Sequence, residues 1–91
     1  MKDSLYIKSR LNDICCTIIP QDKEALQIHQ AKQNTLLWIY NKGNIRTVKE
    51  LEYRIRRLQE ELQVLTFSNT QGFPVKLIKS QLLEVQNILK D

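Results

Sequence analysis

The sequence predicts an all-α protein, a small antiparallel helical bundle of four helices that forms one domain over residues 1–91. Three observations support this prediction. Apolar residues recur at alternating steps of three and four, which is the spacing of one face of a helix. Two glycines and two prolines are too few for a sheet built on tight turns. The segments between the periodic stretches are short, which makes consecutive helices antiparallel neighbours.

The first two helices are expected at residues 3–17 and 20–41. The first has an apolar stripe with a 4-3-4 spacing, formed by Ile7, Leu11, Ile14 and Ile18. It ends before Pro20, because proline disfavours helical geometry at the preceding residue. Pro20 can itself occupy the first turn of the second helix, where Asp22 has the charge that the helix dipole favours. Gly43 is a natural left-handed stop after that helix.

The third helix, expected at residues 48–67, has the strongest pattern in the chain. Thr47 and Glu50 form a capping box, in which each side chain accepts a hydrogen bond from the other residue's backbone N–H. Six apolar residues then follow a 3-4-3-4-3 spacing: Val48, Leu51, Ile55, Leu58, Leu62 and Leu65. Each contributes about 1.5–3 kcal/mol when buried, so this ladder needs a covering surface. The first and second helices have stripes of matching period and are expected to supply it.

The fourth helix is expected at residues 74–90 and begins with Pro74. Its stripe has a 3-4-3-4 spacing and consists of Val75, Ile78, Leu82, Val85 and Leu89. This stripe either completes the bundle or faces a partner chain, and we treat it as the candidate partner-facing surface. The residues predicted to form the packed core are Ile14, Trp38, Leu51, Ile55, Leu58 and Leu62. Near the end of the second helix, either Trp38 or Ile39 should face inward.

The sequence predicts no catalytic residue, no cofactor site and no metal site, and therefore no enzyme. His29 is the only histidine, whereas a nucleophile needs a base and an orienting group beside it. The sequence leaves open a fold that brings Cys15 or Cys16 to His29, but a histidine on the side of a helix is the favoured interpretation. A structural zinc site takes four nitrogen or sulfur ligands, and these residues offer three.

The net charge of +4 is mildly basic, and the cluster Arg54, Arg56 and Arg57 is its densest part. A basic helix can bind phosphates, so a nucleic-acid-binding protein is one alternative. That alternative would use Arg46, Lys49, Arg54, Arg56 and Arg57. Opposite charges four residues apart favour a self-paired, solvated face instead. These pairs are Glu50–Arg54, Glu52–Arg56, Arg56–Glu60 and Arg57–Glu61.

A cytoplasmic, reducing location is expected. No apolar run approaches the roughly 20 residues that cross a bilayer, and no leader pattern opens the chain, so no membrane contact is predicted. The two cysteines are adjacent, and neighbouring cysteines rarely bridge each other. A disulfide framework is therefore not expected, which fits a compartment that keeps thiols reduced.

Residues 3 to 65 contain segments in an order that a known family shares. The segments are Asp3-Ser4-Leu5-Tyr6-Ile7 with Ile14, Ile19-Pro20-Gln21-Asp22-Lys23-Glu24, Leu36-Leu37-Trp38-Ile39, Lys49-Glu50-Leu51-Glu52 and Leu58-Gln59-Glu60-Glu61-Leu62. They include an acidic helix start, a helix end with a tryptophan and, after a polar turn, a Glu-rich amphipathic helix. In this order the chain resembles the helical lid at the C-terminal end of the seventy-kilodalton heat-shock chaperones, the DnaK-type family.

The resemblance implies a helical lid that closes over a peptide held by a separate β-sandwich, with closure driven by an ATPase domain. The expected function is therefore a non-catalytic lid of the substrate-binding domain of a stress-response chaperone. Its partners would be the rest of a chaperone, a client or a co-chaperone. The alternative is a free-standing helical protein-interaction module that self-associates through the ladder or the last stripe. Weak nucleic-acid binding is the third hypothesis.

Overall fold

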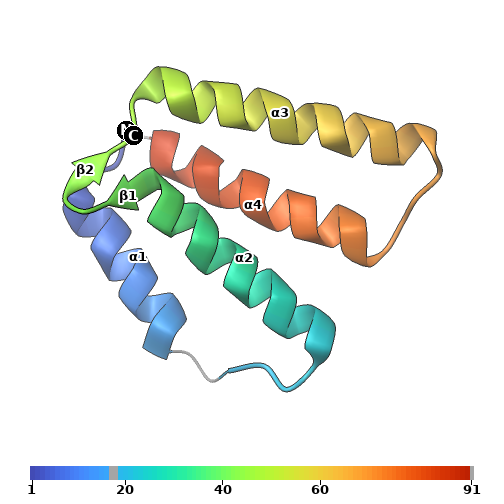
Figure 1. The fold of residues 1–91 in the computed structure, drawn as a ribbon, viewed down its shortest axis with the longest axis horizontal. Helices are drawn as coiled ribbons and strands as arrows, with labels where there is room; N and C mark the ends of the chain where they lie inside the picture. The colour runs from blue at the N-terminus through green and yellow to red at the C-terminus, as the bar shows by residue number, and fades with distance from the viewer. Residues whose placement is uncertain (17–18, 91) are drawn as a thin grey trace.

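The computed structural model describes residues 1–16 and 19–90. The elements are α1 (Ser4–Cys16), α2 (Lys23–Ile39), β1 (Tyr40–Asn41), β2 (Asn44–Ile45), α3 (Val48–Phe67) and α4 (Phe73–Leu89). The helices pack against one another, which confirms the all-α bundle (Figure 1). The predicted helix end at Thr17 and the stripe residue Ile18 lie outside the described residues.

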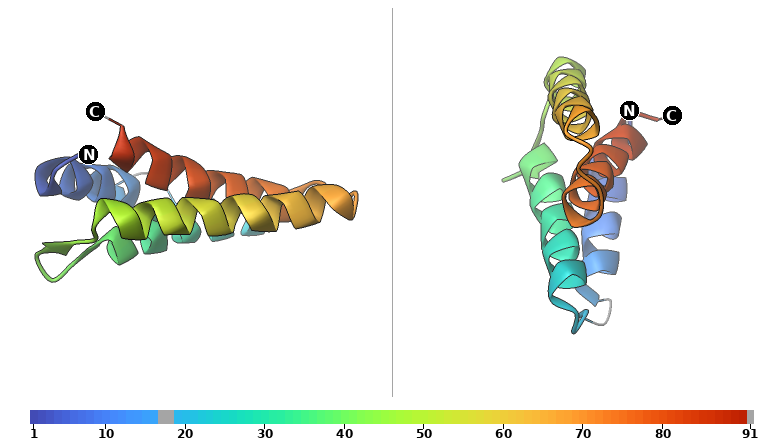
Figure 2. Two further views of the ribbon diagram at one scale, coloured as in Figure 1. Left: turned by 90° about the horizontal axis from the view of Figure 1, so that it is seen from above. Right: turned by 90° about the vertical axis from the view of Figure 1, so that its right-hand side faces the viewer.

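The last helix of the chain lies in the middle of the bundle. The helices lie side by side in the order α1, α2, α4, α3, so that α4 packs against both α2 and α3 (Figures 1 and 2). Consecutive helices within the pairs α1–α2 and α3–α4 are antiparallel, whereas the neighbours α2 and α4 run in the same direction. The molecule is flattened, with extents of 39 × 34 × 21 Å.

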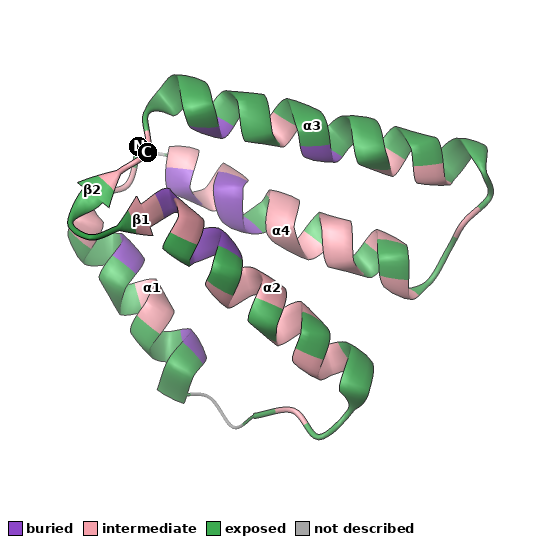
Figure 3. Cartoon of the chain, viewed as in Figure 1, coloured by how far each residue is buried: buried purple, intermediate pink, exposed green. Residues whose placement is uncertain are grey.

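The buried core draws on all four helices. It consists of Ile7, Ile14, Leu36, Ile39, Leu51, Leu58, Val85 and Ile88. On α2 and α4 the buried positions gather toward the end of the molecule that carries the β-hairpin and both termini (Figure 3). The opposite end, where α3 turns into α4, shows mainly exposed and half-buried surface. The bundle is therefore tightly packed at one end and open at the other.

The α4 stripe is covered inside the chain, so of the two predicted outcomes it completes the bundle, and its place as the candidate partner-facing surface is corrected. Val85 is fully buried, and Ile78, Leu82 and Leu89 are half-buried against the core. Val75 is also half-buried and lies at the loop end of the helix. The physical reason is the short loop at residues 68–72, which folds α4 back along the α3 ladder. Accordingly, α4 is the principal cover of that ladder, in place of α1 and α2.

The α2 helix begins and ends inside its predicted range. The Asp22 side chain accepts a hydrogen bond from the Ala25 N–H at 3.0 Å, so Asp22 is the N-cap and Pro20 lies before the helix. At the other end the chain turns through Lys42 and Gly43, whose φ angles are 52° and 83°. Positive φ at both central residues is typical of a tight two-residue hairpin turn, and the hairpin replaces the last predicted helical residues.

Both ends of α3 have local hydrogen-bonded caps. The predicted capping box is confirmed, with both Thr47–Glu50 bonds to backbone N–H groups at 3.3 Å. At the C-terminus Asn69 takes a left-handed φ of 54°. The Asn69 N–H donates to the Thr66 carbonyl, and the Thr70 N–H donates to the Leu65 carbonyl. This pattern is a Schellman motif, and it reverses the chain toward α4.

Candidate functional site

The outer face of α3 exposes three large apolar side chains together with two charged ones. We define this outer face as Tyr53, Arg56, Glu60, Val64 and Phe67, which are spaced 3-4-4-3 along the helix. These residues lie on the side of the helix opposite the ladder, in which Leu51 and Leu58 are buried while Val48 at its start is 44% exposed. Phe67 is 90% exposed, Val64 63% and Tyr53 61%. Because a buried phenylalanine contributes about 1.5–3 kcal/mol, such a face is a surface that gains from being covered.

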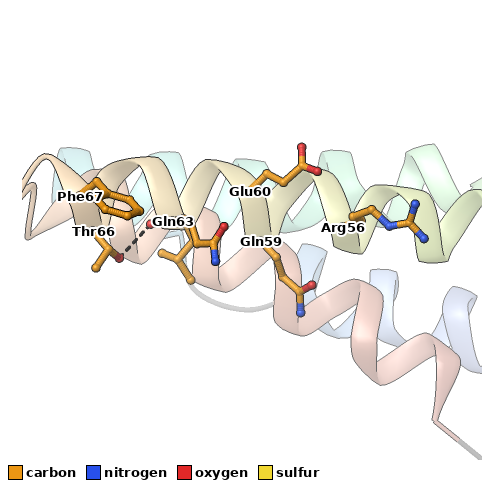
Figure 4. A pocket seen from close by; sticks show the side chains of 7 residues that line it. Arg56, Gln59, Glu60, Gln63, Thr66 and Phe67 are labelled. Atoms are coloured by element: carbon orange, nitrogen blue, oxygen red, sulfur yellow. Dashed lines mark hydrogen bonds between the residues drawn. The ribbon is translucent and has the colours of Figure 1, made fainter.

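A shallow depression of about 720 Å³ runs beside this face (Figure 4). Its lining side chains all come from α3: Arg56, Gln59, Glu60, Leu62, Gln63, Thr66 and Phe67. Phe67 and Arg56 lie at its two ends. The Thr66 hydroxyl donates to the Leu62 carbonyl at 2.9 Å, so this polar group is satisfied within the helix. The depression thus combines apolar surface with a polar and charged rim, which is the composition of a protein-interaction surface.

Trp38 forms a second cluster where α2, the hairpin and α3 meet. The ring centroid lies 4.5 Å from Cζ of Arg46 and 5.6 Å from Cζ of Arg54. Arg46 also donates through Nε to the Trp38 carbonyl at 2.7 Å and forms an ion pair with Glu50 at 2.8 Å. The hydrogen bond that the Glu50 carboxylate accepts from Arg46 lowers the pKa of this carboxyl. Hollows of about 260 and 290 Å³ are each lined in part by the tryptophan.

An ion pair of low exposure joins α1 to α4. Glu84 is 2% exposed and accepts two hydrogen bonds from Arg10, at 2.7 Å from the terminal nitrogen and 3.3 Å from Nε. This hydrogen bonding raises the pKa of Arg10 above its ordinary value. Nearby, the Lys2 N–H donates to the Ile88 carbonyl, which ties the N-terminus to the end of α4. The pair has a structural role, because the Arg10 guanidinium and the Glu84 carboxylate already bind each other.

The residues predicted for the core lie at different depths. Ile14, Leu51 and Leu58 are buried, while Trp38 and Ile55 are half-buried and pack against the core. Of the two candidates at the end of α2, Ile39 is the fully buried one.

Leu62 is half-buried and lines the depression on α3, so this predicted core residue also contributes to the exposed surface.

The charged side chains of α3 pair differently from the prediction. Among residues 1–16 and 19–90, none of the four expected i,i+4 pairs forms, and Glu50 bonds to Arg46 instead of Arg54. Glu50 pairs with Arg46 because the hairpin brings Arg46 back to the start of α3, where the capping box already holds the Glu50 side chain. Arg54 is thereby left beside Trp38.

The cysteines are exposed and make weak local hydrogen bonds. Gln33 Nε2 donates to Cys15 Sγ at 3.3 Å, and Cys16 Sγ donates to Asn12 Oδ1 at 3.5 Å. Within the described part of the chain, no group of three or more His, Cys, Asp or Glu side chains is placed to hold a metal ion.

Sequence reasoning missed the outer face of α3 and the Arg10–Glu84 pair. Both have a signal in the sequence. Tyr53, Val64 and Phe67 are apolar positions that the ladder does not use, and they share a second helix face. Glu84 is the only acidic residue of α4, and an acidic side chain on a buried helix needs a partner. The position of Trp38 between two arginines depends on the hairpin and has no comparable local signal.

No protein-family model, curated protein or solved structure matches the chain. In addition, no described helix is both long enough and apolar enough to cross a membrane.

Proposed function

We propose that this chain is a non-catalytic protein-interaction domain that binds another protein through the outer face of α3. The carrying observation is Phe67, which is 90% exposed at one end of a depression of about 720 Å³. Val64 and Tyr53 expose further apolar surface on the same face, and Arg56 and Glu60 place charges of both signs between them. Aromatic anchors with a charged rim are typical of surfaces whose central residues dominate binding.

The more specific form of the proposal is a lid subdomain of a seventy-kilodalton heat-shock-type chaperone. It rests on the resemblance of residues 3 to 65. The order of elements is compatible with it: α2 starts at an acidic cap, ends beside Trp38, and is followed by a polar turn and the Glu-rich α3. Such a lid acts by shape and contact, capping a peptide site that another domain provides. Its partners are the rest of that chaperone, a client or a co-chaperone.

The test adds the intact chain to a DnaK-type chaperone that lacks its own lid and holds a fluorescently labelled peptide. We expect the chain to slow peptide dissociation in a concentration-dependent way. Phe67→Ser should remove the effect, because it deletes the anchor of the outer face. Leu83→Ser is the matched control, since Leu83 is 54% exposed but lies on α4.

Unchanged peptide dissociation with the wild-type chain would rule out the lid form of the proposal. An effect that survives in Phe67→Ser would rule out the outer face of α3 as the contact. Sedimentation velocity between about 1 and 100 µM addresses the alternative in which the partner is a second copy. Association with increasing concentration that Phe67→Ser abolishes would assign the outer face to a homodimer.

A further inference from the structure

Arg54 has no acidic partner in the described structure, although the sequence provides one. Glu50 lies four residues before it, but the Glu50 carboxylate is held by Arg46 at 2.8 Å and by the Thr47 N–H at 3.3 Å. Among residues 1–16 and 19–90, no carboxylate or carbonyl accepts a hydrogen bond from the Arg54 side chain. Its guanidinium instead lies 5.6 Å from the Trp38 ring centroid.

The neighbouring arginine already uses two of its side-chain nitrogens as hydrogen-bond donors. Arg46 uses Nε on the Trp38 carbonyl and a terminal nitrogen on Glu50, and its guanidinium lies on the same indole at 4.5 Å. Its backbone N–H donates to the Ile39 carbonyl at 2.9 Å. Arg46 therefore holds the hairpin in place. Arg54 is the cation of this cluster that keeps its hydrogen-bond donors available.

Arg54 lines a hollow of about 260 Å³ to which three helices contribute. The other lining residues are Ala31, Asn34, Thr35, Trp38 and Gln81. Asn34 of α2 and Gln81 of α4 are carboxamides whose side chains bond to no other group in the described structure. The Thr35 hydroxyl is already used on the Ala31 carbonyl at 2.8 Å. The hollow has an aromatic wall, one free cation and two free amides, and none of its lining residues is acidic.

We propose that this hollow binds the carboxylate of an Asp or Glu side chain from a partner protein. A guanidinium presents a planar fork of donors that matches a carboxylate, and one Arg54 charge balances one carboxylate charge. The amide N–H₂ groups of Asn34 and Gln81 can donate to the remaining lone pairs of the carboxylate. A phosphate monoester carries a charge of about −1.5 to −2 and would be only partly neutralised by one cation.

This site is separate from the outer face of α3, because the hollow shares no lining residue with the depression beside that face. The two sites lie on different sides of the same helix. An acidic side chain bound at Arg54 therefore gives the domain a second point of contact with a partner, and its existence does not depend on the proposed function above.

Trp38 provides the experimental signal, since it is the only tryptophan in the chain and lines the hollow. The chain is titrated with a peptide whose ends are capped and carry no charge, acetyl-Ala-Glu-Ala-Glu-Ala-amide. A second peptide, in which Gln replaces both Glu residues, is titrated at the same ionic strength. We expect a saturable fluorescence change with the Glu peptide and none with the Gln peptide. Side-chain amide NMR signals of Asn34 and Gln81 should shift in the same titration.

Arg54→Gln tests the assignment, and Arg57→Gln is the matched control on the same helix. We expect Arg54→Gln to weaken binding at least tenfold and Arg57→Gln to leave it within twofold. Arg54→Lys should weaken it several-fold, because lysine keeps the charge but lacks the fork. Far-UV circular dichroism confirms that each variant is folded.

Three results would overturn the proposal. The first is Glu-peptide binding that persists in Arg54→Gln. The second is an equal response to inorganic phosphate at matched ionic strength, which would indicate a general anion site. The third is a single-stranded oligonucleotide that binds more tightly than the Glu peptide and loses affinity in Arg54→Gln, which would assign the hollow to nucleic acid.

Discussion

The third and fourth helices have apolar stripes of nearly the same spacing, yet one helix lies at the edge of the bundle and the other in its middle. The α3 ladder is the longer one, but α3 lies at the edge and exposes Val64 and Phe67. The α4 helix packs against α2 and α3 and is tied to α1 by Glu84. Its Val85 and Ile88 are fully buried. The length of an apolar stripe therefore does not determine how deeply its helix is buried.

The difference follows from what surrounds each stripe. Between its apolar positions α3 has charged side chains around much of its circumference, and burying unpaired charges is costly. The charged residues of α4 are Lys76, Lys79 and Glu84. Both lysines are exposed near the loop end, and Glu84 is neutralised by Arg10. The central position is therefore occupied by α4, because its surface can be covered on several sides without burying unpaired charges.

The strongest test of this comparison is the α3–α4 packing itself. Leu58→Ala removes a side chain that is 2% exposed in the middle of the ladder. We expect a loss of about 2–5 kcal/mol in the free energy of unfolding, since the cavity adds to the lost burial. Urea denaturation followed by circular dichroism measures it, with Val64→Ala on the outer face as the control. A loss below about 1 kcal/mol would mean that the ladder is not covered.

Breaking the ion pair between α4 and α1 should cause the next largest loss in the free energy of unfolding. Arg10→Ala leaves the buried Glu84 carboxylate without its cation, and breaking a buried pair in this way costs about 3–5 kcal/mol. Because the Arg10 side chain is 36% exposed, we expect the lower end, about 3 kcal/mol. The double variant Arg10→Met with Glu84→Leu should recover most of the loss in the same denaturation assay. Equal instability of the single and double variants would argue against this explanation.

The start of α3 contributes less, because it is a local cap at the edge of the bundle. Thr47→Ala removes the hydroxyl that accepts from the Glu50 N–H and should cost about 0.5–2 kcal/mol. Thr47→Ser keeps the hydroxyl and is expected to behave like the wild type. Thermal melts of the three proteins provide the comparison, and an equally unstable Thr47→Ser would point to packing instead of capping.

The charge of Glu50 should make the stability of the same cap depend on pH. Hydrogen bonding from Arg46 lowers the pKa of Glu50 below its ordinary value of 4.5. A carboxyl with a lowered folded-state pKa stabilises the fold above that ordinary value, and its contribution is lost as the pH falls through the folded-state pKa. We expect Glu50→Gln to melt below the wild type at pH 7, with the gap closing toward pH 3. A gap independent of pH would contradict the ionic origin.

The smallest effect on stability is expected at the outer face of α3. Phe67 is 90% exposed, so Phe67→Ser should change the free energy of unfolding by less than about 0.5 kcal/mol. The same urea denaturation assay measures it. A clear destabilisation would show that Phe67 packs against the bundle and is unavailable to a partner.

Local features of the fold were predictable residue by residue. The Thr47–Glu50 capping box and the position of α3 each depend on neighbours within a few positions. Gly43, predicted as the stop of α2, lies instead in the hairpin turn, after the helix has ended at Ile39. The hairpin was missed because each of its strands has only two residues, too few for a periodic signal. Its consequence for the site is large, since the hairpin brings Arg46 to Glu50 and leaves Arg54 beside Trp38.

The sequence by itself determined four amphipathic helices, their approximate ends and the apolar positions on each. These properties follow from hydrogen bonds and spacings within one segment. Tertiary structure alone decided that α4 lies at the centre, that Glu84 pairs with Arg10 and that Phe67 faces solvent. The physical reason is that burial depends on which distant surfaces cover a helix, and one apolar stripe can pack against several partners. The choice among them is made by the whole chain.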